Sequence, residues 1–169
     1  MKWLNCDDKG KYNFDNSCRR PKLSSKHDKL EVAIAEEFSP RFAPDAKLIY
    51  IRDTKQKTLV LDKAAFTKLG ILVSKHGEFP DMILYNSRKK WLFFIEAVTT
   101  RDFISPKHQQ ELERLFKKCK AGKIYVTAFL EFATYTKYAD QIAWDTEVWI
   151  AEMPSRMIHY NGERFLGPR

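Results

Sequence analysis

Two carboxylates, Asp81 and Glu96, stand within a strongly apolar stretch of the sequence. Asp81 precedes the apolar run Met82–Tyr85, and Glu96 follows the run Trp91–Ile95. The polar segment Asn86–Lys90 separates the two runs. Short apolar runs on either side of a turn-forming polar segment are typical of a β-hairpin. The sequence therefore predicts a hairpin that carries one carboxylate on each strand.

A hairpin with a symmetric turn and no bulge would bring these two carboxylates together. Its register pairs Tyr85 with Leu92 and, four positions further on, Asp81 with Glu96. Directly opposed residues share a face of the sheet, with Cβ atoms roughly 4.5–5.5 Å apart. Two anions at that separation repel each other, so one must take a proton or a cation must lie between them. Oxygen ligands of this kind suit Mg²⁺.

Each carboxylate alone also fits a purely structural role. Asp81 could simply open a strand, and Glu96 could face solvent at an edge. The two together, inside so apolar a hairpin, favour a functional site over two solvated side chains.

The segment 29–38 has the pattern of a helix. Asp28 followed by Glu31 resembles a capping box. Glu37 falls in the middle of the apolar stripe, where a carboxylate needs a partner. It could be a third metal ligand or orienting group, or it could pair with an arginine. The stripe itself recurs at helical spacing and consists of Leu30, Ala33, Ile34 and Phe38.

The remaining pattern predicts an α/β fold with a mixed central sheet flanked by helices. Strand, helix and strand over residues 91–130 should form a parallel, right-handed crossover. Pro40 and Pro44 should end the first helix, and Asn161-Gly162 suits the turn of an extra C-terminal hairpin. The other expected elements are a hairpin of Lys47–Ile51 and Thr58–Leu61, a short helix from Asp62 to Gly70, a helix from Pro106 to about Lys120, a strand Lys123–Leu130, a helix Phe132–Trp144, a strand Glu147–Met153 and a hairpin of Met157–Tyr160 with Glu163–Leu166.

The charge balance favours an anionic partner. The chain has 169 residues and a net charge of +8, and nucleic acid is the first candidate for its partner. The turn cations Arg88, Lys89 and Lys90 fit either a solvated turn or a phosphate clamp. Residues 1–27 are basic and weakly patterned, and we expect an arm or linker remnant there, which could also contact DNA. The domain itself should span residues 28–169.

Cysteine usage and hydropathy limit the setting in which the chain acts. Three scattered cysteines, Cys6, Cys18 and Cys119, form neither a disulfide framework nor a zinc-like spacing. The N-terminus has no long apolar stretch, and no run is long enough to cross a membrane. We therefore expect a cytoplasmic protein without a membrane partner.

Longer motifs extend the pattern around the two carboxylates. Pro80-Asp81 followed one hairpin later by Glu96 resembles the PD-(D/E)xK nuclease superfamily. The longer match is to the BsuBI/PstI type II restriction endonuclease family, over about residues 29–169. The segments that carry this resemblance are His76–Asp81, Trp91–Thr99, Tyr125–Phe129, Ile142–Ala151 and Ile158–Gly162.

The resemblance implies Mg²⁺-dependent cleavage of double-stranded DNA by a homodimer, with a cognate DNA methyltransferase in the same system. Asp81 and Glu96 would bind the metal, and the backbone carbonyl of Ala97 could supply another oxygen. Members of the family carry an additional N-terminal domain, which is absent here or reduced to residues 1–27. Two other functions stay open, a DNA-binding module that kept the fold without the chemistry and a structure-specific repair nuclease.

One position departs from the superfamily pattern. A lysine two residues after the glutamate would share its strand face, but Val98 stands there. Lys107, which opens the next helix, is the first candidate to replace that cation. Lys55 and Lys57, in the neighbouring hairpin, are the alternatives.

Overall fold

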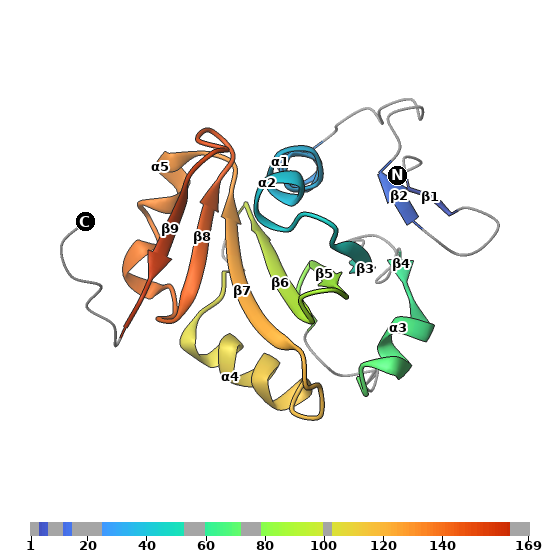
Figure 1. Ribbon diagram of the computed structural model, residues 1–169. Helices are drawn as coiled ribbons and strands as arrows, with labels where there is room; N and C mark the ends of the chain where they lie inside the picture. The colour runs from blue at the N-terminus through green and yellow to red at the C-terminus, as the bar shows by residue number, and fades with distance from the viewer. Residues whose placement is uncertain are drawn as a thin grey trace.

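The computed structural model describes residues 25–52, 60–71, 79–99 and 103–162, together with the backbone of two short paired strands, β1 (Leu4–Cys6) and β2 (Tyr12–Phe14). A seven-stranded sheet with helices on both faces forms the body of the protein (Figure 1). The α/β fold expected from the sequence is confirmed. Within the described residues, no helix is long and apolar enough to cross a membrane.

The sheet has the strand order β4-β3-β5-β6-β7-β8-β9. Its central strands β6 and β7 are parallel, as the predicted crossover requires, and β7 and β8 are also parallel. All other neighbouring pairs are antiparallel. The strands are β3 (Lys47–Ile51), β4 (Val60–Leu61), β5 (Met82–Asn86), β6 (Trp91–Val98), β7 (Gly122–Phe129), β8 (Thr146–Ile150) and β9 (Met157–Tyr160).

The β5–β6 hairpin has the predicted register. Tyr85 lies opposite Leu92, and Met82 lies opposite Ile95. A four-residue turn, 87–90, closes the hairpin without shifting the pairing. The next position along the ladder therefore sets Asp81 opposite Glu96.

A bulge interrupts the register between β3 and β5. Leu48 pairs with Leu84 but Tyr50 pairs with Ile83, so Ile49 is the extra residue of the bulge. Ile49 and Tyr50 consequently pack in the same core cluster, whereas Leu48 and Ile51 pack in the other. The bulge reverses the alternation of side chains along the rest of the strand.

The first helix begins earlier and ends later than the sequence pattern predicts. It consists of α1 (Lys26–Ala33), a π-helical segment η1 (Ile34–Phe38) and α2 (Ser39–Phe42). The capping box uses Ser25 and Asp28, not Asp28 and Glu31. Pro40 does not end the helix but lies in the first turn of α2, directly after the wider π turn.

Several other elements differ in extent from the prediction. Helix α3 (Lys63–Lys68), capped by Asp62, and helix α4 (Pro106–Leu115), capped by Ser105, begin where expected. The expected helix 132–144 is instead a short α5 (Phe132–Tyr135) and a 3-10 turn η2 (Ala139–Gln141). Strand β9 pairs with β8, and the second arm of the expected C-terminal hairpin, from Glu163, lies outside the described residues.

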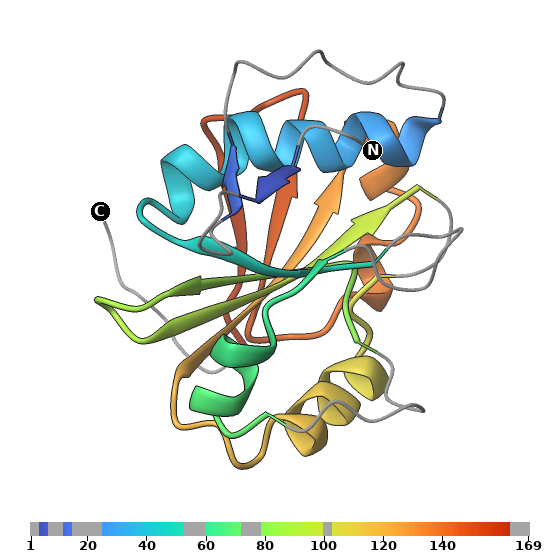
Figure 2. The same cartoon turned by 90° about the vertical axis from the view of Figure 1, so that its right-hand side faces the viewer.

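The sheet separates the core into two faces, visible in Figure 2, where α1 and α2 cover one face and α3 and α4 cover the other. Phe93, Ile95 and Ala97 of β6 face α1, whereas Leu92 and Phe94 face α4. Since side chains alternate along a strand, Glu96 belongs to the α4 face. Glu96 lies near the carboxyl end of β6. Helices α1 and α4 both begin at this end of the sheet (Figure 2).

Candidate active site

Arg52, Asp81 and Glu96 form a row across three adjacent strands. Arg52 follows Ile51, the partner of Met82, and its backbone N–H donates to the carbonyl oxygen of Asp81 at 2.8 Å. Asp81 is in turn opposite Glu96, and its Oδ2 accepts from the backbone N–H of Ala97 at 2.9 Å. The structure thus brings together the two carboxylates that the sequence singled out.

Both carboxylates of this row are buried, which sets their electrostatics. Asp81 is 7% exposed and Glu96 is 2% exposed. Burial raises the pKa of Glu96 well above its ordinary range, and the charge of Asp81 and a hydrogen bond between the two carboxyl groups raise it further. A pair in this state takes up a proton or a cation readily, since either one removes the repulsion.

The guanidinium of Arg52 provides a positive charge in the same row. It donates through Nη2 to the carbonyl oxygen of Phe79, which fixes the segment just before Asp81. Burial alone would lower the pKa of Arg52, but a hydrogen bond with Tyr50 and the charges of Asp81 and Glu96 outweigh it and raise the pKa. Nothing in the sequence pattern marks Arg52 as a site residue, because plain strand alternation without the Ile49 bulge would place its side chain on the opposite face.

Helix α1 contributes a third carboxylate, which is Glu31 rather than Glu37. Glu31 is 1% exposed, and its Oε1 lies 3.3 Å from Nε2 of His27. Its Oε2 is buried and has no hydrogen-bond partner among the described residues. Burial raises the pKa of Glu31, and the negative charge of Asp81 is among the interactions that raise it further.

His27 links this helix to the strand row. Its hydrogen bond with Glu31 raises the pKa of His27 most, burial opposes the rise, and the charge of Asp81 and a hydrogen bond to the backbone of Ala97 add to it. Ala97 thus donates its N–H to Asp81 and also contacts His27. Its backbone lies inside the site, although its role as a metal ligand stays a prediction.

Glu37 does not point into the site. It forms an ion pair with Arg41 at 2.6 Å, and both side chains are 43% exposed. Pairing with an arginine was the other reading of Glu37, and it is the one that the structure shows. The expected stripe included Ala33, whereas the structure buries Ala35, so the centre of the buried face lies at Glu31.

Lys107 does not point into the site either. Its side chain is 87% exposed and lies 3.7 Å from Glu111 on the surface of α4. The next residue, His108, faces the sheet instead, and its Nε2 is 3.4 Å from Oε1 of Glu96. One residue of a helix turns about 100°, which separates the surface lysine from the histidine in the site. Lys55 and Lys57 lie outside the described residues.

Val98 belongs to the core. It is 1% exposed and packs with Phe129, Ile142, Val148 and Ile150. No cation occupies the strand position where the superfamily carries lysine, and Arg52 is the cation that the row offers instead.

The donors of this site fit a divalent cation. Asp81, Glu96 and Glu31 supply carboxylate oxygens, and the unpartnered Oε2 of Glu31 is a buried acceptor that lacks a donor within the described chain. Hard cations such as Mg²⁺ take such oxygen ligands. Within the described residues, however, no three His, Cys, Asp or Glu side chains already have a ligating arrangement.

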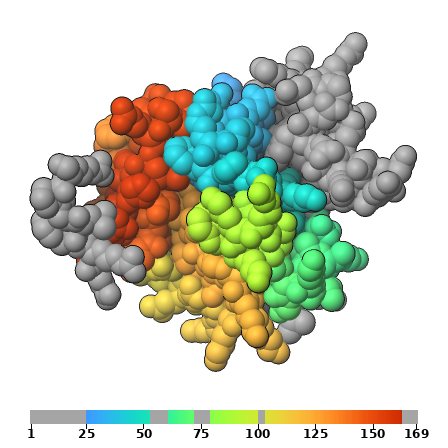
Figure 3. All heavy atoms as spheres, viewed as in Figure 1, coloured from blue at the N-terminus to red at the C-terminus, as the bar shows by residue number. Residues whose placement is uncertain are grey.

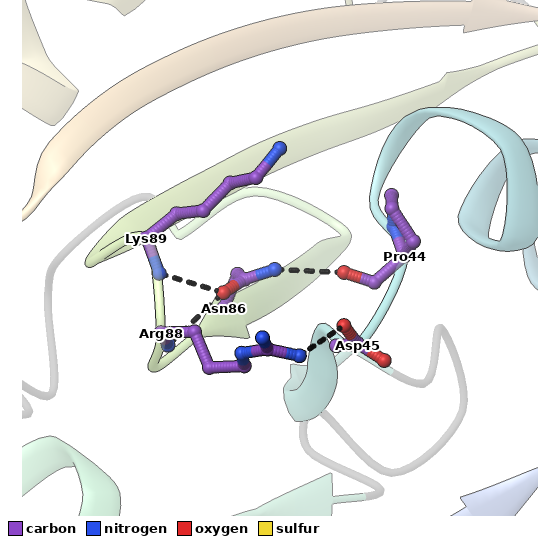
Figure 4. A network of polar contacts seen from close by, with 5 residues as sticks. All are labelled: Pro44, Asp45, Asn86, Arg88 and Lys89. Atoms are coloured by element: carbon purple, nitrogen blue, oxygen red, sulfur yellow. Dashed lines mark hydrogen bonds and ion pairs between the residues drawn. The ribbon is translucent and has the colours of Figure 1, made fainter.

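The turn cations lie at the other end of the hairpin. Asn86 anchors this turn by donating to the carbonyl oxygen of Pro44 at 2.7 Å and accepting from the N–H groups of Arg88 and Lys89 (Figure 4). Arg88 also lies 3.4 Å from Asp45. The strand from Trp91 to Glu96 covers roughly 17 Å at about 3.3 Å per residue. The turn is therefore too far away to contact a group bound at the carboxylates.

Comparisons with known proteins identify the family of the chain. Residues 13–163 match the BsuBI/PstI restriction endonuclease domain. The chain is 44% identical over 142 residues to the type II restriction enzyme BsuBI of Bacillus subtilis, covering 84% of this chain and 45% of that enzyme. It is 28% identical to the type II restriction enzyme AplI of Arthrospira platensis, covering 91% and 56% of the two chains.

A solved structure supports the same relationship. The SdaI restriction endonuclease superposes with a TM-score of 0.79 at 38% identity, over 86% of this chain and 46% of that one. The chain thus spans about half the length of the relatives that it matches.

Proposed function

The chain belongs to the BsuBI/PstI restriction endonuclease family, and from this premise we propose that it is the catalytic part of a type II restriction endonuclease that hydrolyses phosphodiester bonds of double-stranded DNA. The observation that carries the proposal is the row of Arg52, Asp81 and Glu96 across three strands. Buried carboxylates beside a fixed cation suit the binding of a metal and a phosphate. A DNA-binding module without chemistry would have no use for such a costly arrangement.

We propose Mg²⁺ as the metal, held by Asp81 and Glu96 with Glu31 close by. When bound, such an ion polarises a phosphate oxygen and lowers the pKa of a water molecule. The ion also offsets the repulsion between the two buried carboxylates. The carbonyl oxygen of Ala97 stays a further candidate ligand.

The side chains of the protein have distinct parts in this proposal. The N–H of Ala97 orients the carboxylate of Asp81, and the guanidinium of Arg52 offsets the charge that develops on the phosphate. Arg52 thus takes the part of the lysine that Val98 replaces. His27 and His108 orient the carboxylates of Glu31 and Glu96, their respective neighbours.

We further propose that the complete enzyme acts as a homodimer in the cytoplasm, beside a cognate DNA methyltransferase. A palindromic target suits a protein with two-fold symmetry. The net charge of +8 suits a polyanionic substrate.

Cleavage of supercoiled plasmid with Mg²⁺ tests the proposal. Discrete bands that vanish with EDTA and in Asp81→Ala are the expected result. The Glu37→Gln variant, altered only in an exposed ion pair, should cut like the wild type. A smear with the same controls would mean cleavage without site recognition, and intact plasmid that still shifts on a gel would leave only a DNA-binding module.

A further inference from the structure

A hollow of about 350 Å³ lies at the opposite end of the sheet from the carboxylates. Leu69, Gly70, Tyr85 and Ala121 line it together with four lysines, which are Lys68, Lys90, Lys118 and Lys120. They come from the end of α3, the β5–β6 turn and the segment before β7, which lie next to one another in Figure 3. We propose that this four-lysine hollow binds a phosphate group.

Backbone contacts hold the three segments in place. Lys90 has a left-handed backbone, φ 55°, and its carbonyl oxygen accepts from the N–H of Gly122 at 2.8 Å. A non-glycine residue keeps this conformation only when its surroundings fix it. Gly70 ends α3 with φ 69°, and a Cβ there would stand 3.7 Å from the carbonyl oxygen of Lys118.

The lysine-bearing segment 118–120 is anchored to the core. Cys119, between Lys118 and Lys120, is 7% exposed and packs in the cluster beneath α4. Its N–H donates to the carbonyl oxygen of Phe116 at 3.0 Å. The flanking lysines are therefore held on the outer side of an ordered turn, at the rim of the hollow.

The charge of the hollow is uncompensated within the described part of the chain. None of the four lysines forms an ion pair there, although Lys26, Lys107 and Lys123 elsewhere on the surface each have a carboxylate partner. Among the residues that the structure describes, no acidic side chain lines the hollow. Like charges in one place destabilise the fold slightly unless an anion binds between them. A phosphate group offers several acceptor oxygens to ammonium donors, which makes it the matching ligand.

A DNA backbone or a free polyphosphate could supply this phosphate. The six residues from Lys90 to Glu96 separate the hollow from the carboxylates by roughly 20 Å at about 3.3 Å per residue. At about 3.4 Å per nucleotide of one strand, that is roughly six base pairs along a duplex. A duplex cut at the carboxylates could thus place a more distant phosphate at the hollow. Binding of polyphosphate does not depend on the proposed cleavage.

Binding to two probes, tripolyphosphate and a 30-base-pair duplex in EDTA, tests the proposal on the whole chain. The variant Lys118→Ala/Lys120→Ala is compared with Lys63→Ala/Lys137→Ala, which loses the same charge from exposed positions away from the hollow. We expect the hollow variant to bind tripolyphosphate roughly tenfold more weakly and the control to change less than twofold. Melting temperatures check that both fold, and Lys118→Arg/Lys120→Arg should keep the binding.

The duplex identifies the source of the phosphate. The site takes a backbone phosphate if the hollow variant also loses affinity for the duplex. The slope of the logarithm of its binding constant against the logarithm of the salt concentration should then be smaller in magnitude by about 1 than that of the control. If only tripolyphosphate binding falls, the site takes a free polyphosphate. Equal losses in the hollow and control variants would overturn the proposal, because net charge alone would explain them. Failure of plasmid cleavage would leave all of these results unchanged.

Discussion

The backbone N–H of Arg52 donates to the carbonyl oxygen of Asp81 at 2.8 Å, which ties the end of β3 to the start of β5. The side chain of Arg52 donates to Phe79 on the same segment. Arg52 thus fixes the backbone that carries Asp81 while its charge faces both carboxylates. These two roles make it the residue whose replacement is most informative.

We predict that Arg52→Gln lowers the rate of DNA cleavage by roughly 10²–10³, the cost of removing one charge-stabilising donor. DNA affinity should change far less, because the charge acts mainly on the transition state. Arg52→Lys should recover part of the rate, since lysine keeps the charge but not the planar donors. Single-turnover cleavage and duplex binding, measured side by side, separate the two quantities.

Arg41→Gln is the matched control for this series, because Arg41 pairs with Glu37 on the surface. It should retain the wild-type cleavage rate. Equal rates for Arg52→Gln and Arg41→Gln would show that Arg52 does not offset charge at the phosphate.

Glu31 and Glu37, on the same helical segment, provide a second contrast. Glu31→Gln removes the buried charge with the unpartnered oxygen, whereas Glu37→Gln removes an exposed one. We predict that Glu31→Gln weakens Mg²⁺ binding by about tenfold or more, as losses beside a metal commonly do. Glu37→Gln should bind Mg²⁺ like the wild type. Isothermal titration with Mg²⁺ measures the affinity of both variants. If Glu37→Gln weakens Mg²⁺ binding and Glu31→Gln does not, Glu37 is the third carboxylate after all.

Glu96 should destabilise the metal-free fold. It is 2% exposed beside Asp81, so Glu96→Gln removes a buried acid that is costly to ionise. At pH 8 and in EDTA, we predict a higher melting temperature for Glu96→Gln than for the wild type. The rise should be roughly 2–4 °C for each kcal/mol by which the free energy of unfolding increases. Mg²⁺ should then stabilise the wild type and leave the variant nearly unchanged. A lower melting temperature in EDTA would mean that Glu96 stabilises the fold without a metal.

The β5–β6 hairpin was predictable because its signals are local. Its turn is short and continuous apolar runs flank it on both sides, so the pairing of Tyr85 with Leu92 follows from counting outward from the turn. That register placed Asp81 opposite Glu96 without knowledge of any other element.

The other site residues depend on features that counting does not reveal. The bulge at Ile49 moves Arg52 to the face of Glu96, and the sequence around it contains no glycine that would signal a bulge. On the helices, the prediction chose the wrong side of the helix each time. Choosing Ala33 over Ala35 selected Glu37, and one residue of α4 separates Lys107 from His108.

A polar cluster on the α4 face should make stability depend on pH. Burial alone would raise the pKa of Glu113, but hydrogen bonds from Lys123 and Tyr125 outweigh it and lower the pKa. Because the pKa of Glu113 is lower in the folded state, its ionised carboxylate stabilises the fold at pH values above the pKa of the unfolded chain, about 4.3. This stabilisation is lost as the pH falls through the pKa of the folded state. Glu113→Ala should therefore cost up to about 1 kcal/mol at pH 7, given the exposed carboxylate.

Urea unfolding of both proteins at pH 7 and pH 3 measures this difference. The difference in the free energy of unfolding between the wild type and Glu113→Ala should be smaller at pH 3 than at pH 7. Glu111→Ala, which removes a neighbouring carboxylate from α4, serves as the control and should show little change at either pH. If this difference in the free energy of unfolding is the same at both pH values, the stability lost in Glu113→Ala comes from packing around Tyr125 and not from the charge.

The last prediction concerns the position where the superfamily carries lysine. Val98 is 1% exposed among Phe129, Val148 and other apolar side chains, so a lysine there would place a charge in the core. We predict that Val98→Lys costs roughly 3 kcal/mol or more, the penalty for an uncompensated buried charge. Thr99→Lys, which adds the same charge at the next and more exposed residue, should cost much less. Urea unfolding measures both variants, and plasmid cleavage by Val98→Lys completes the test. A stable Val98→Lys that cuts faster than the wild type would show that the strand can still accept the lysine and that Arg52 is an incomplete replacement for it.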